Sequence, residues 1–435
     1  MSETFSQIKT LISQENFCEW KNLDSIKQNI ITQAIASPNS PHCIVYPQTP
    51  AELASIIACV YDSNGGILLC GGNSKLSWGG LAQNVDIVVS TERLNQLIEH
   101  AVGDLTVTVE AGTKFADLQA TLAKSGQFLP LDPASPESAT IGGIIATADS
   151  GSLRQRYGGV RDLLLGITFV RADGQIALAG GRVVKNVAGY DLMKLFTGSY
   201  GTLGAICQAT LRVYPLPEAS ETVVLIGDVE NLTQATKTLR ASALTPAKFD
   251  LLSPGLVKNL QLADGMGLIA NFASLSESVK QQSATLVEVG KQLGLYSSIY
   301  TSKDESTLWQ KLQQQMRQPG KESQITCKIG IVPSAAVEVL LQLDDANRGI
   351  GLIHASSGLG VWRCPADTTV AEILRVRSLC QSSGGFLTIL EAPIACKQQL
   401  DVWGYSGNSL ELMRKIKHQF DPRNILNPLR FVGGI

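Results

Sequence analysis

Three glycine-rich segments, each bordered by apolar residues typical of β-strands, lie between Cys70 and Ile206 and constrain the fold more than any other feature. Glycine adopts backbone conformations that other residues avoid, and it lets the main chain approach a ligand closely. Successive backbone N–H groups can then turn toward an anion such as a diphosphate. Each segment alone is also consistent with an ordinary glycine turn. Three of them together favour a cofactor held by loops.

The three segments differ in sequence. The first, 70–80, reads CGGNSKLSWGG and follows an apolar strand predicted over 66–70. The second, 131–147, reads LDPASPESATIGGIIAT, and its Gly-Gly pair predicts either a close backbone approach to a ligand or a bulged strand. The third, 182–206, contains RVVKNVAGYDL and then GSYGTLGAI before a strand. The first segment has neither the Walker A nor the Rossmann pattern.

Length and composition indicate a folded protein of two or three domains, with 435 residues, 44% hydrophobic and 17% charged. A net charge of −2 without basic runs argues against a nucleic-acid partner. The nine cysteines are scattered and lack a C-x-x-C pair, which argues against a zinc or iron–sulfur site and favours reduced thiols. Without a secretory signal or an apolar run near ~20 residues, we expect a cytoplasmic protein with no direct membrane span, membrane-associated only through partners.

Apolar periodicity and turn residues predict alternating strands and helices. The expected strands are 43–46, 66–70, 85–90, 105–110, 203–214 and a hairpin of 167–171 with 176–179; the expected helices are 50–62, 115–125, 276–293, 367–382 and 408–420. The first 37 residues read as helical and polar. From 218 to 393 the pattern predicts strands with two long helices, beginning after a proline pair at 215–217 that marks a boundary.

These segments, in this order, resemble the FAD-binding domain of the vanillyl-alcohol oxidase and p-cresol methylhydroxylase (PCMH) family. PQTPAEL at 47–53 and FDPRNILNP at 420–428 are similar to the two ends of that family's chains. Within the family, the strings at 182–204, 211–217 and 401–404 are similar to the E-type FAD-binding subunit of glycolate oxidase, a glycolate dehydrogenase.

The resemblance implies an α+β fold with a PCMH-type FAD-binding domain and a smaller antiparallel α+β cap. We expect an N-terminal helical extension over 1–38, the FAD-binding domain over 39–217, the cap over 218–395, and a segment over 396–435 that returns to the FAD-binding domain. The FAD-binding domain would consist of two α+β halves that meet near residue 100, with the flavin between them.

The resemblance also implies that FAD is bound without a covalent link, because Asn73 stands where covalent relatives have a histidine. The first segment would hold the diphosphate, and the other two would line the isoalloxazine ring and the ribityl chain. Cys70 is expected to be a core residue. The expected cofactor-binding residues are Gly71, Gly72, Asn73, Ser74, Lys75, Leu76, Pro133, Glu137, Ala139, Thr140, Gly142, Gly143, Ala146, Thr147, Ser199, Gly201, Thr202, Leu203, Gly204 and Ile206.

A metal site is not expected, and no catalytic base can be assigned. The metal-dependent relatives use paired histidines and a carboxylate in the cap, whereas His354 has no second histidine nearby and Glu391 has no evident metal partner. His354 is therefore interpreted as a structural histidine. By resemblance, Lys185 and Tyr190 would face the flavin, although Lys185 is also suited to pair with Asp191.

Three functions stay open at this point. The resemblance favours the flavin subunit of a glycolate or D-lactate dehydrogenase complex, with a second flavin subunit that oxidises the 2-hydroxy acid and an iron–sulfur subunit that accepts the electrons. The alternatives are a self-sufficient FAD-dependent oxidoreductase of a small hydroxy acid or alcohol, and a non-catalytic scaffold that carries FAD.

Overall fold

The computed structural model describes residues 2–36, 39–182, 189–317, 324–344 and 349–435. The chain separates into two compact units. Unit 1 comprises Met1–Ser150, Gly159–Pro215 and Tyr405–Ile435, and unit 2 comprises Gly151–Gly158 and Leu216–Gly404. The short segment 151–158 thus belongs to unit 2, although the residues on both sides of it belong to unit 1.

Unit 1 begins with a four-stranded sheet of order β1-β2-β4-β3, in which β2, β4 and β3 are parallel and β1 is antiparallel to β2. The strands are β1 (Phe17–Glu19), β2 (Cys43–Val45), β3 (Ile67–Cys70) and β4 (Ile87–Ser90). Three helices belong with this sheet: α1 (Ser2–Leu11), α2 (Ser25–Thr32) and α3 (Pro50–Asp62). Because side chains alternate across a strand, Val45 and Ile67 pack with α1 and α3, and Ile44 and Leu68 pack with α2.

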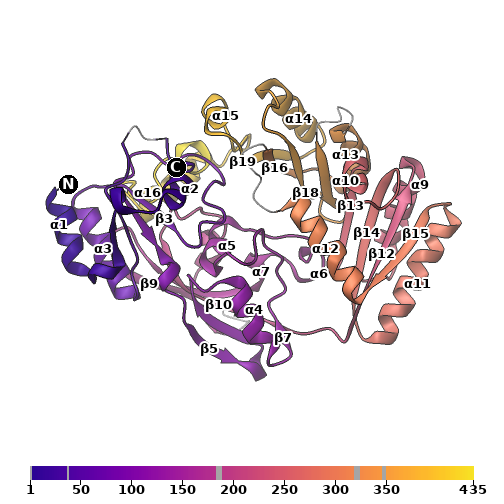
Figure 1. The fold of residues 1–435 in the computed structure, drawn as a ribbon, viewed down its shortest axis with the longest axis horizontal. Coiled ribbons are helices and arrows are strands. Elements are labelled where there is room, and N and C mark those ends of the chain that lie inside the picture. The colour runs from indigo at the N-terminus through magenta and orange to yellow at the C-terminus, as the bar shows by residue number, and fades with distance from the viewer. Residues whose placement is uncertain (1, 37–38, 183–188, 318–323, 345–348) are drawn as a thin grey trace. The chain divides into compact units, whose positions relative to one another are not determined.

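The second sheet of unit 1 is antiparallel, with five strands in the order β5-β6-β10-β8-β9. Its strands β5, β9 and β10 are labelled in Figure 1. The strands are β5 (Leu97–Ala101), β6 (Thr106–Glu110), β8 (Leu164–Val170), β9 (Ile176–Gly180) and β10 (Ala205–Arg212); β7 (Gln127–Phe128) pairs with β11 (Tyr214–Pro215) separately. The helices of this part are α4 (Phe115–Ala123), α5 (Ile141–Thr147), α7 (Val160–Leu163), α8 (Leu192–Phe196) and the C-terminal α16 (Leu410–Phe420). One apolar cluster joins α4, α5 and α8 to β6, β8 and β10.

Unit 2 is built on an eight-stranded antiparallel sheet of order β15-β12-β14-β13-β17-β18-β16-β19. Its strands are β12 (Ala219–Gly227), β13 (Lys248–Leu252), β14 (Met266–Ser274), β15 (Tyr296–Thr301), β16 (Gln324–Gly330), β17 (Ile350–His354), β18 (Leu359–Pro365) and β19 (Phe386–Glu391). Its helices are α6 (Arg154–Tyr157), α9 (Val229–Ala241), α10 (Pro254–Asn259), α11 (Ser276–Gln292), α12 (Ser302–Met316), α13 (Ala336–Asp344), α14 (Val370–Ser382) and α15 (Ile394–Gln399).

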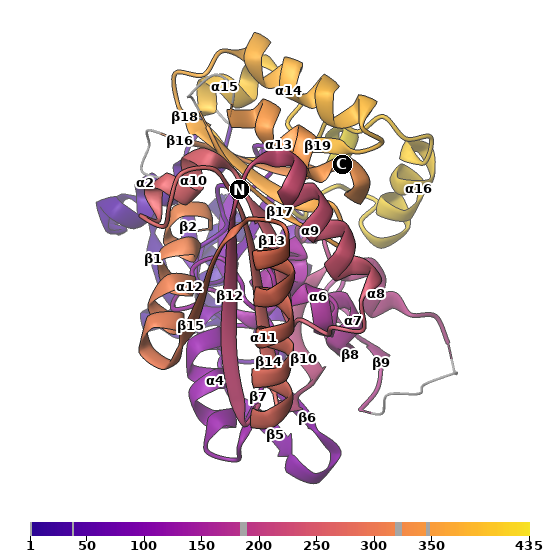
Figure 2. The same cartoon turned by 90° about the vertical axis from the view of Figure 1, so that its right-hand side faces the viewer.

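The two faces of this sheet carry different helices. One apolar cluster joins α9, α11, α13 and α14 to one set of alternating strand residues, such as Val223 and Leu225. The other set, including Val224 and Ile226, packs against α10 and α12. Figure 2 shows α11 lying along β12 and β14, in agreement with the contacts between these elements. Burial of both faces explains why the strand patterns in this region are dominated by apolar residues.

Most predicted elements are present, and the helix over 50–62 has the expected bounds, with Thr49 accepting a hydrogen bond from the Glu52 N–H and Pro50 at the first position. The two long helices predicted between 218 and 393 are present as α11 and α14, but two further long helices, α9 and α12, were missed. Their apolar residues follow a helical spacing within otherwise polar sequence, which makes the pattern faint. The strand β1 was missed within the polar N-terminal stretch; it exists because it pairs with β2.

Candidate functional site

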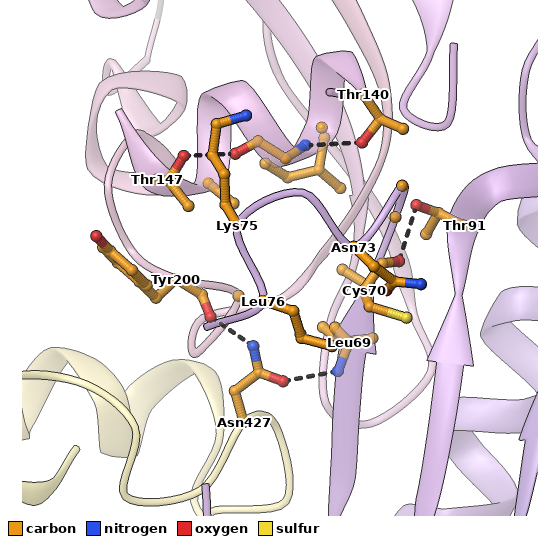
Figure 3. A pocket seen from close by; sticks show the side chains of 18 of the residues that line it. Leu69, Cys70, Asn73, Lys75, Leu76, Thr91, Thr140, Thr147, Tyr200 and Asn427 are labelled. Carbon is orange, nitrogen blue, oxygen red and sulfur yellow. Dashed lines mark hydrogen bonds between the residues drawn. The ribbon is translucent and has the colours of Figure 1, made fainter. Parts of the chain in front are cut away.

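A pocket in unit 1, with about 740 Å³ of empty space open to solvent, brings together segments that are far apart in the sequence. Its wall comes from the end of β3 and the loop after it, from α5, from the loop that precedes β10, and from the C-terminal segment (Figure 3). All three glycine-rich segments therefore contribute to one cavity.

The first glycine segment packs closely against the second. A Cβ atom added to Gly72 would lie 2.0 Å from the Ser138 carbonyl oxygen, and one added to Gly71 would lie 2.4 Å from the Thr140 Oγ1. Asn73 then takes a left-handed backbone conformation with φ of 60°. Its Oδ1 is buried without a hydrogen-bond partner among the described residues, so it remains available to a donor from a ligand.

The second segment forms a helix where a bulged strand had been the alternative. α5 begins after Thr140, whose Oγ1 accepts a hydrogen bond from the Gly143 N–H at 3.3 Å. The Thr147 hydroxyl donates to the Gly143 carbonyl at 2.7 Å (Figure 3). A Cβ on Gly142 would lie 2.8 Å from the Ala111 Cβ, whereas a Cβ on Gly143 would approach only the Thr140 Oγ1, at 3.1 Å. Both glycines line the pocket, but Gly142 also permits close packing of α5 on Ala111, whereas Gly143 leaves open space beside it.

The C-terminal segment closes the pocket against the third glycine segment. The Asn427 Oδ1 accepts from the Leu69 N–H at 2.7 Å, and the Asn427 Nδ2 donates to the Tyr200 carbonyl (Figure 3). Gly201 is left-handed, with φ of 74°, and a Cβ there would lie 2.6 Å from the Asn427 Nδ2. A side chain at position 201 would collide with Asn427, so this contact requires a glycine there.

Two cations and one thiol stand out in the lining. Arg430 donates hydrogen bonds to the carbonyls of Leu76 and Trp78, and burial lowers its pKa to about 10, so it stays charged at neutral pH. Lys75 is buried, with its Nζ 3.3 Å from the Asp149 Oδ2. Burial raises the pKa of the Cys70 thiol to about 12, which keeps it protonated.

Fourteen of the twenty predicted cofactor-binding residues line this pocket. They are Gly71, Gly72, Asn73, Ser74, Lys75, Leu76, Thr140, Gly142, Gly143, Ala146, Thr147, Gly201, Gly204 and Ile206. The other six, which are not among the lining residues, are Pro133, Glu137, Ala139, Ser199, Thr202 and Leu203. Of these, Ala139 and Leu203 lie in the apolar core behind the wall, and the Thr202 hydroxyl donates to the Ser199 carbonyl at 2.7 Å.

Seven lining residues were missed by the sequence interpretation: Leu69, Cys70, Thr91, Tyr200, Ala205, Asn427 and Arg430. Asn427 lies inside the 420–428 motif already singled out, so that motif was the available signal. Cys70, expected in the core, is half-buried, packs against an apolar cluster and lines the pocket.

The expected flavin-facing role of Tyr190 is not supported, because its side chain is 89% exposed and is not among the residues that line the pocket. Lys185 lies outside the described residues. Asp191, its suggested partner, forms an ion pair with Lys194 at 2.8 Å. The third segment therefore contributes to the pocket through its later part, 200–206, which includes Gly201 and Gly204.

In unit 2, His354 is held by a buried carboxylate. Its Nδ1 lies 2.6 Å from the Asp250 Oδ1, and the Ser152 hydroxyl donates to the Asp250 Oδ2 at 2.5 Å. Asp250 and His354 face each other in register on β13 and β17. Among the described residues, no group of three or more His, Cys, Asp or Glu side chains is arranged to hold a metal ion.

The pocket fits FAD. A diphosphate needs backbone N–H groups and cations, which the glycine segments and Lys75 supply. The unpartnered Asn73 Oδ1 offers an acceptor for a cofactor N–H or hydroxyl group. The open space next to Gly143 leaves room for a flat group against α5.

Comparison with known proteins agrees with this chemistry. A model of the FAD binding domain matches residues 41–180, and a model of the C-terminal domain of FAD linked oxidases matches residues 403–430. Among solved structures, 4-ethylphenol oxidase from Gulosibacter chungangensis has a TM-score of 0.75 at 12% identity, and p-cresol methylhydroxylase has 0.70 at 15%; each comparison covers 99% of this chain and 96% of the other. The protein is an FAD-dependent oxidoreductase with a PCMH-type fold.

Curated relatives of this chain include two glycolate oxidase subunits and a D-lactate dehydrogenase. Glycolate oxidase subunit GlcD of Bacillus subtilis is 33% identical over 214 residues, which are 49% of this chain and 45% of that protein. The GlcE subunit of Escherichia coli is 36% identical over 155 residues, 35% of this chain and 44% of that protein. D-lactate dehydrogenase of Archaeoglobus fulgidus is 27% identical over 412 residues, 89% of this chain and 91% of that protein. The matches to the two glycolate oxidase subunits thus span less than half of each subunit's length.

Within the described residues, no helix is both long and apolar enough to cross a membrane.

Proposed function

We propose that this chain is the FAD-carrying subunit of a glycolate or D-lactate dehydrogenase complex, and that it relays electrons from a 2-hydroxy acid to an iron–sulfur partner. Its relatives include two glycolate oxidase subunits and a D-lactate dehydrogenase, which supports the substrate class. Bound FAD would accept two electrons and pass them on. The glycine segments, Asn73 and Lys75 would hold it.

The main support for an electron-relay role is the charge of the side chains that line the pocket. Of the described residues that line it, only Lys75 and Arg430 bear a formal charge, and both are cationic. Oxidation of a hydroxy acid needs a base near the hydroxyl group. The described lining residues offer cations that favour an anionic cofactor, but no carboxylate or imidazole. We therefore assign oxidation of the 2-hydroxy acid to a second flavin subunit.

A self-sufficient oxidoreductase is the second candidate, and the pairing of Asp250 with His354 favours it. A carboxylate at Nδ1 fixes the ring and its tautomer, and leaves Nε2 as the nitrogen that can exchange a proton. Such a pair is suited to accept the hydroxyl proton of a substrate.

Reconstitution separates these candidates. The purified chain would be mixed with a flavin subunit that holds a metal site, an iron–sulfur subunit, glycolate or D-lactate, and an artificial acceptor. Each component would then be omitted in turn. We expect little turnover from this chain alone, and full turnover only when all three are present and this chain retains its FAD. Rapid turnover by this chain alone would replace the relay with the self-sufficient enzyme. Full turnover with an FAD-free variant would favour a scaffold.

A further inference from the structure

The carboxylate of Asp149 joins three separate parts of the pocket wall. Its Oδ2 lies 3.3 Å from the Lys75 Nζ in the first glycine segment, and it accepts a hydrogen bond from the Ala134 N–H at 2.8 Å. Asp149 itself follows the end of α5, after Ala148, whose φ of 49° is left-handed and ends the helix. One side chain therefore connects the first segment to the start of the second segment and to the end of the helix that the second segment forms.

The charges of this pair are almost completely removed from water, since the side chains of Lys75 and Asp149 are 4% and 1% exposed. A buried ammonium is costly unless an opposite charge lies beside it. Asp149 therefore stabilises the Lys75 ammonium. Without that carboxylate, the ammonium would lack the opposite charge that now lies 3.3 Å from it.

Lys75 is among the residues that line the pocket, whereas Asp149 is not among the described lining residues. Of the two members of the pair, Lys75 is therefore the one that belongs to the pocket wall. Arg430, the other cation of the lining, donates hydrogen bonds to the backbone carbonyls of Leu76 and Trp78. Lys75 is consequently the cation best situated to meet an anion that enters the first glycine segment.

We propose that Asp149 is a positioning residue that holds the Lys75 ammonium against the diphosphate of FAD. This inference rests on the proposed assignment of the pocket to FAD. Asp149 would not touch the cofactor itself. It would act through Lys75, by keeping that side chain charged and in place at the edge of the pocket.

The test compares FAD with riboflavin, which has the isoalloxazine ring and ribityl chain but no phosphate. Affinities of the apoprotein for both would be measured by flavin fluorescence for the native chain, Lys75→Met, Asp149→Asn and the double variant. We expect FAD to bind about ten- to a hundredfold more weakly to each single variant, the range for loss of one charged hydrogen bond. Riboflavin should bind all four proteins equally, and the double variant should bind FAD no more weakly than Lys75→Met.

Asp86→Asn is the matched control. Asp86 also lies in unit 1 and accepts a hydrogen bond from a backbone N–H, that of Gly66 at 2.7 Å, but it does not line the pocket. Its substitution should leave the affinity for FAD unchanged. If Asp149→Asn alone does not fold, the double variant is compared with Lys75→Met, since it removes both charges of the pair. Equal FAD affinities would support the proposal.

Several results would overturn the positioning role of Asp149. They are native FAD affinity in Asp149→Asn, additive losses in the double variant, or a parallel loss of riboflavin affinity, which would assign Lys75 to the flavin ring. These failures differ from failure of the proposed function. If the native chain itself binds no FAD, the assignment of the pocket is wrong. If the native chain binds FAD and Asp149→Asn binds it equally well, only this inference is refuted.

Discussion

The side-chain Oδ1 of Asn427 accepts a hydrogen bond from the backbone N–H of Leu69 at 2.7 Å, although 358 positions separate the two residues. Leu69 belongs to the strand that leads into the first glycine segment, and Asn427 lies near the C-terminus. The same amide donates to the Tyr200 carbonyl beside the third segment. A single buried side chain thus connects three regions of the proposed FAD pocket.

Replacing Asn427 with alanine should weaken both the fold and the pocket. Each lost partner leaves a buried polar group unsatisfied, and we expect the free energy of unfolding to fall by about 1–3 kcal/mol. FAD occupancy should fall with it. Urea unfolding and the ratio of flavin to protein measure the two effects. Asn408→Ala, at an exposed site in unit 1, should change neither, and an Asn427→Ala protein of native stability would contradict the structural role.

Gly143→Val should abolish FAD retention while the chain stays folded. The new side chain would meet little of the protein, because only the Thr140 Oγ1 lies within 4 Å of the Cβ position, so it would occupy the cavity instead. Gly143 has the backbone of α5, so steric exclusion, and not an unusual φ, is the reason. Flavin absorbance of the purified protein is the measurement.

The adjacent glycine provides the contrast. Gly142→Val would press into Ala111, and overpacking of this kind costs about 1–3 kcal/mol in stability. Its main effect should be a lower melting temperature of the apoprotein. Full flavin occupancy in Gly143→Val would make the second segment merely structural.

FAD should be released by acid precipitation, leaving a colourless pellet and a yellow supernatant. Asn73 is not a residue that bonds covalently to flavin, and the nearby thiol of Cys70 has a pKa raised to about 12 by burial, so almost no thiolate exists at neutral pH. A yellow pellet would show a covalent link. The same experiment on Cys70→Ser would then test whether that thiol is the attachment point.

Lys417→Met should destabilise unit 1 strongly. Lys417 is buried on α16, where its Nζ donates to the Asp421 Oδ2 at 2.6 Å and to the Thr202 carbonyl at 2.8 Å, and burial lowers its pKa. Removing one partner of a buried ion pair costs about 3–5 kcal/mol. Lys415→Met on the same helix is the control, because its pair with Glu411 is exposed. Its effect, measured by the same denaturant unfolding, should stay within about 0.5 kcal/mol. Equal effects would refute the role assigned to burial.

Local sequence patterns predicted much of this protein. The helix Pro50–Asp62 was predictable because its cap, its first proline and its apolar spacing are all local. The β8–β9 hairpin was likewise evident from the Asp173-Gly174 turn between apolar stretches. The expectation that the chain binds FAD rested on the sequences of the glycine segments and on their resemblance to known FAD-binding domains.

Elements that depend on distant partners could not be predicted in the same way. The stretch Ile141–Thr147 is apolar and contains two glycines, which is compatible with a strand or a helix. It is a helix because Gly142 permits close packing on Ala111 and Thr140 caps the first turn. The short strand β1 likewise exists only because β2 is available to pair with it.

The sequence by itself determined the fold class, the main elements and the glycine segments that suit a diphosphate-bearing cofactor, since these depend on the chemistry of neighbouring residues. Only the tertiary structure decided which residues surround the pocket. Asp149 meets Lys75, and Arg430 meets Trp78, through contacts that chain folding alone creates. Such contacts follow no periodicity or fixed spacing in the sequence. The role of these buried charged and amide side chains is therefore visible only in the folded structure.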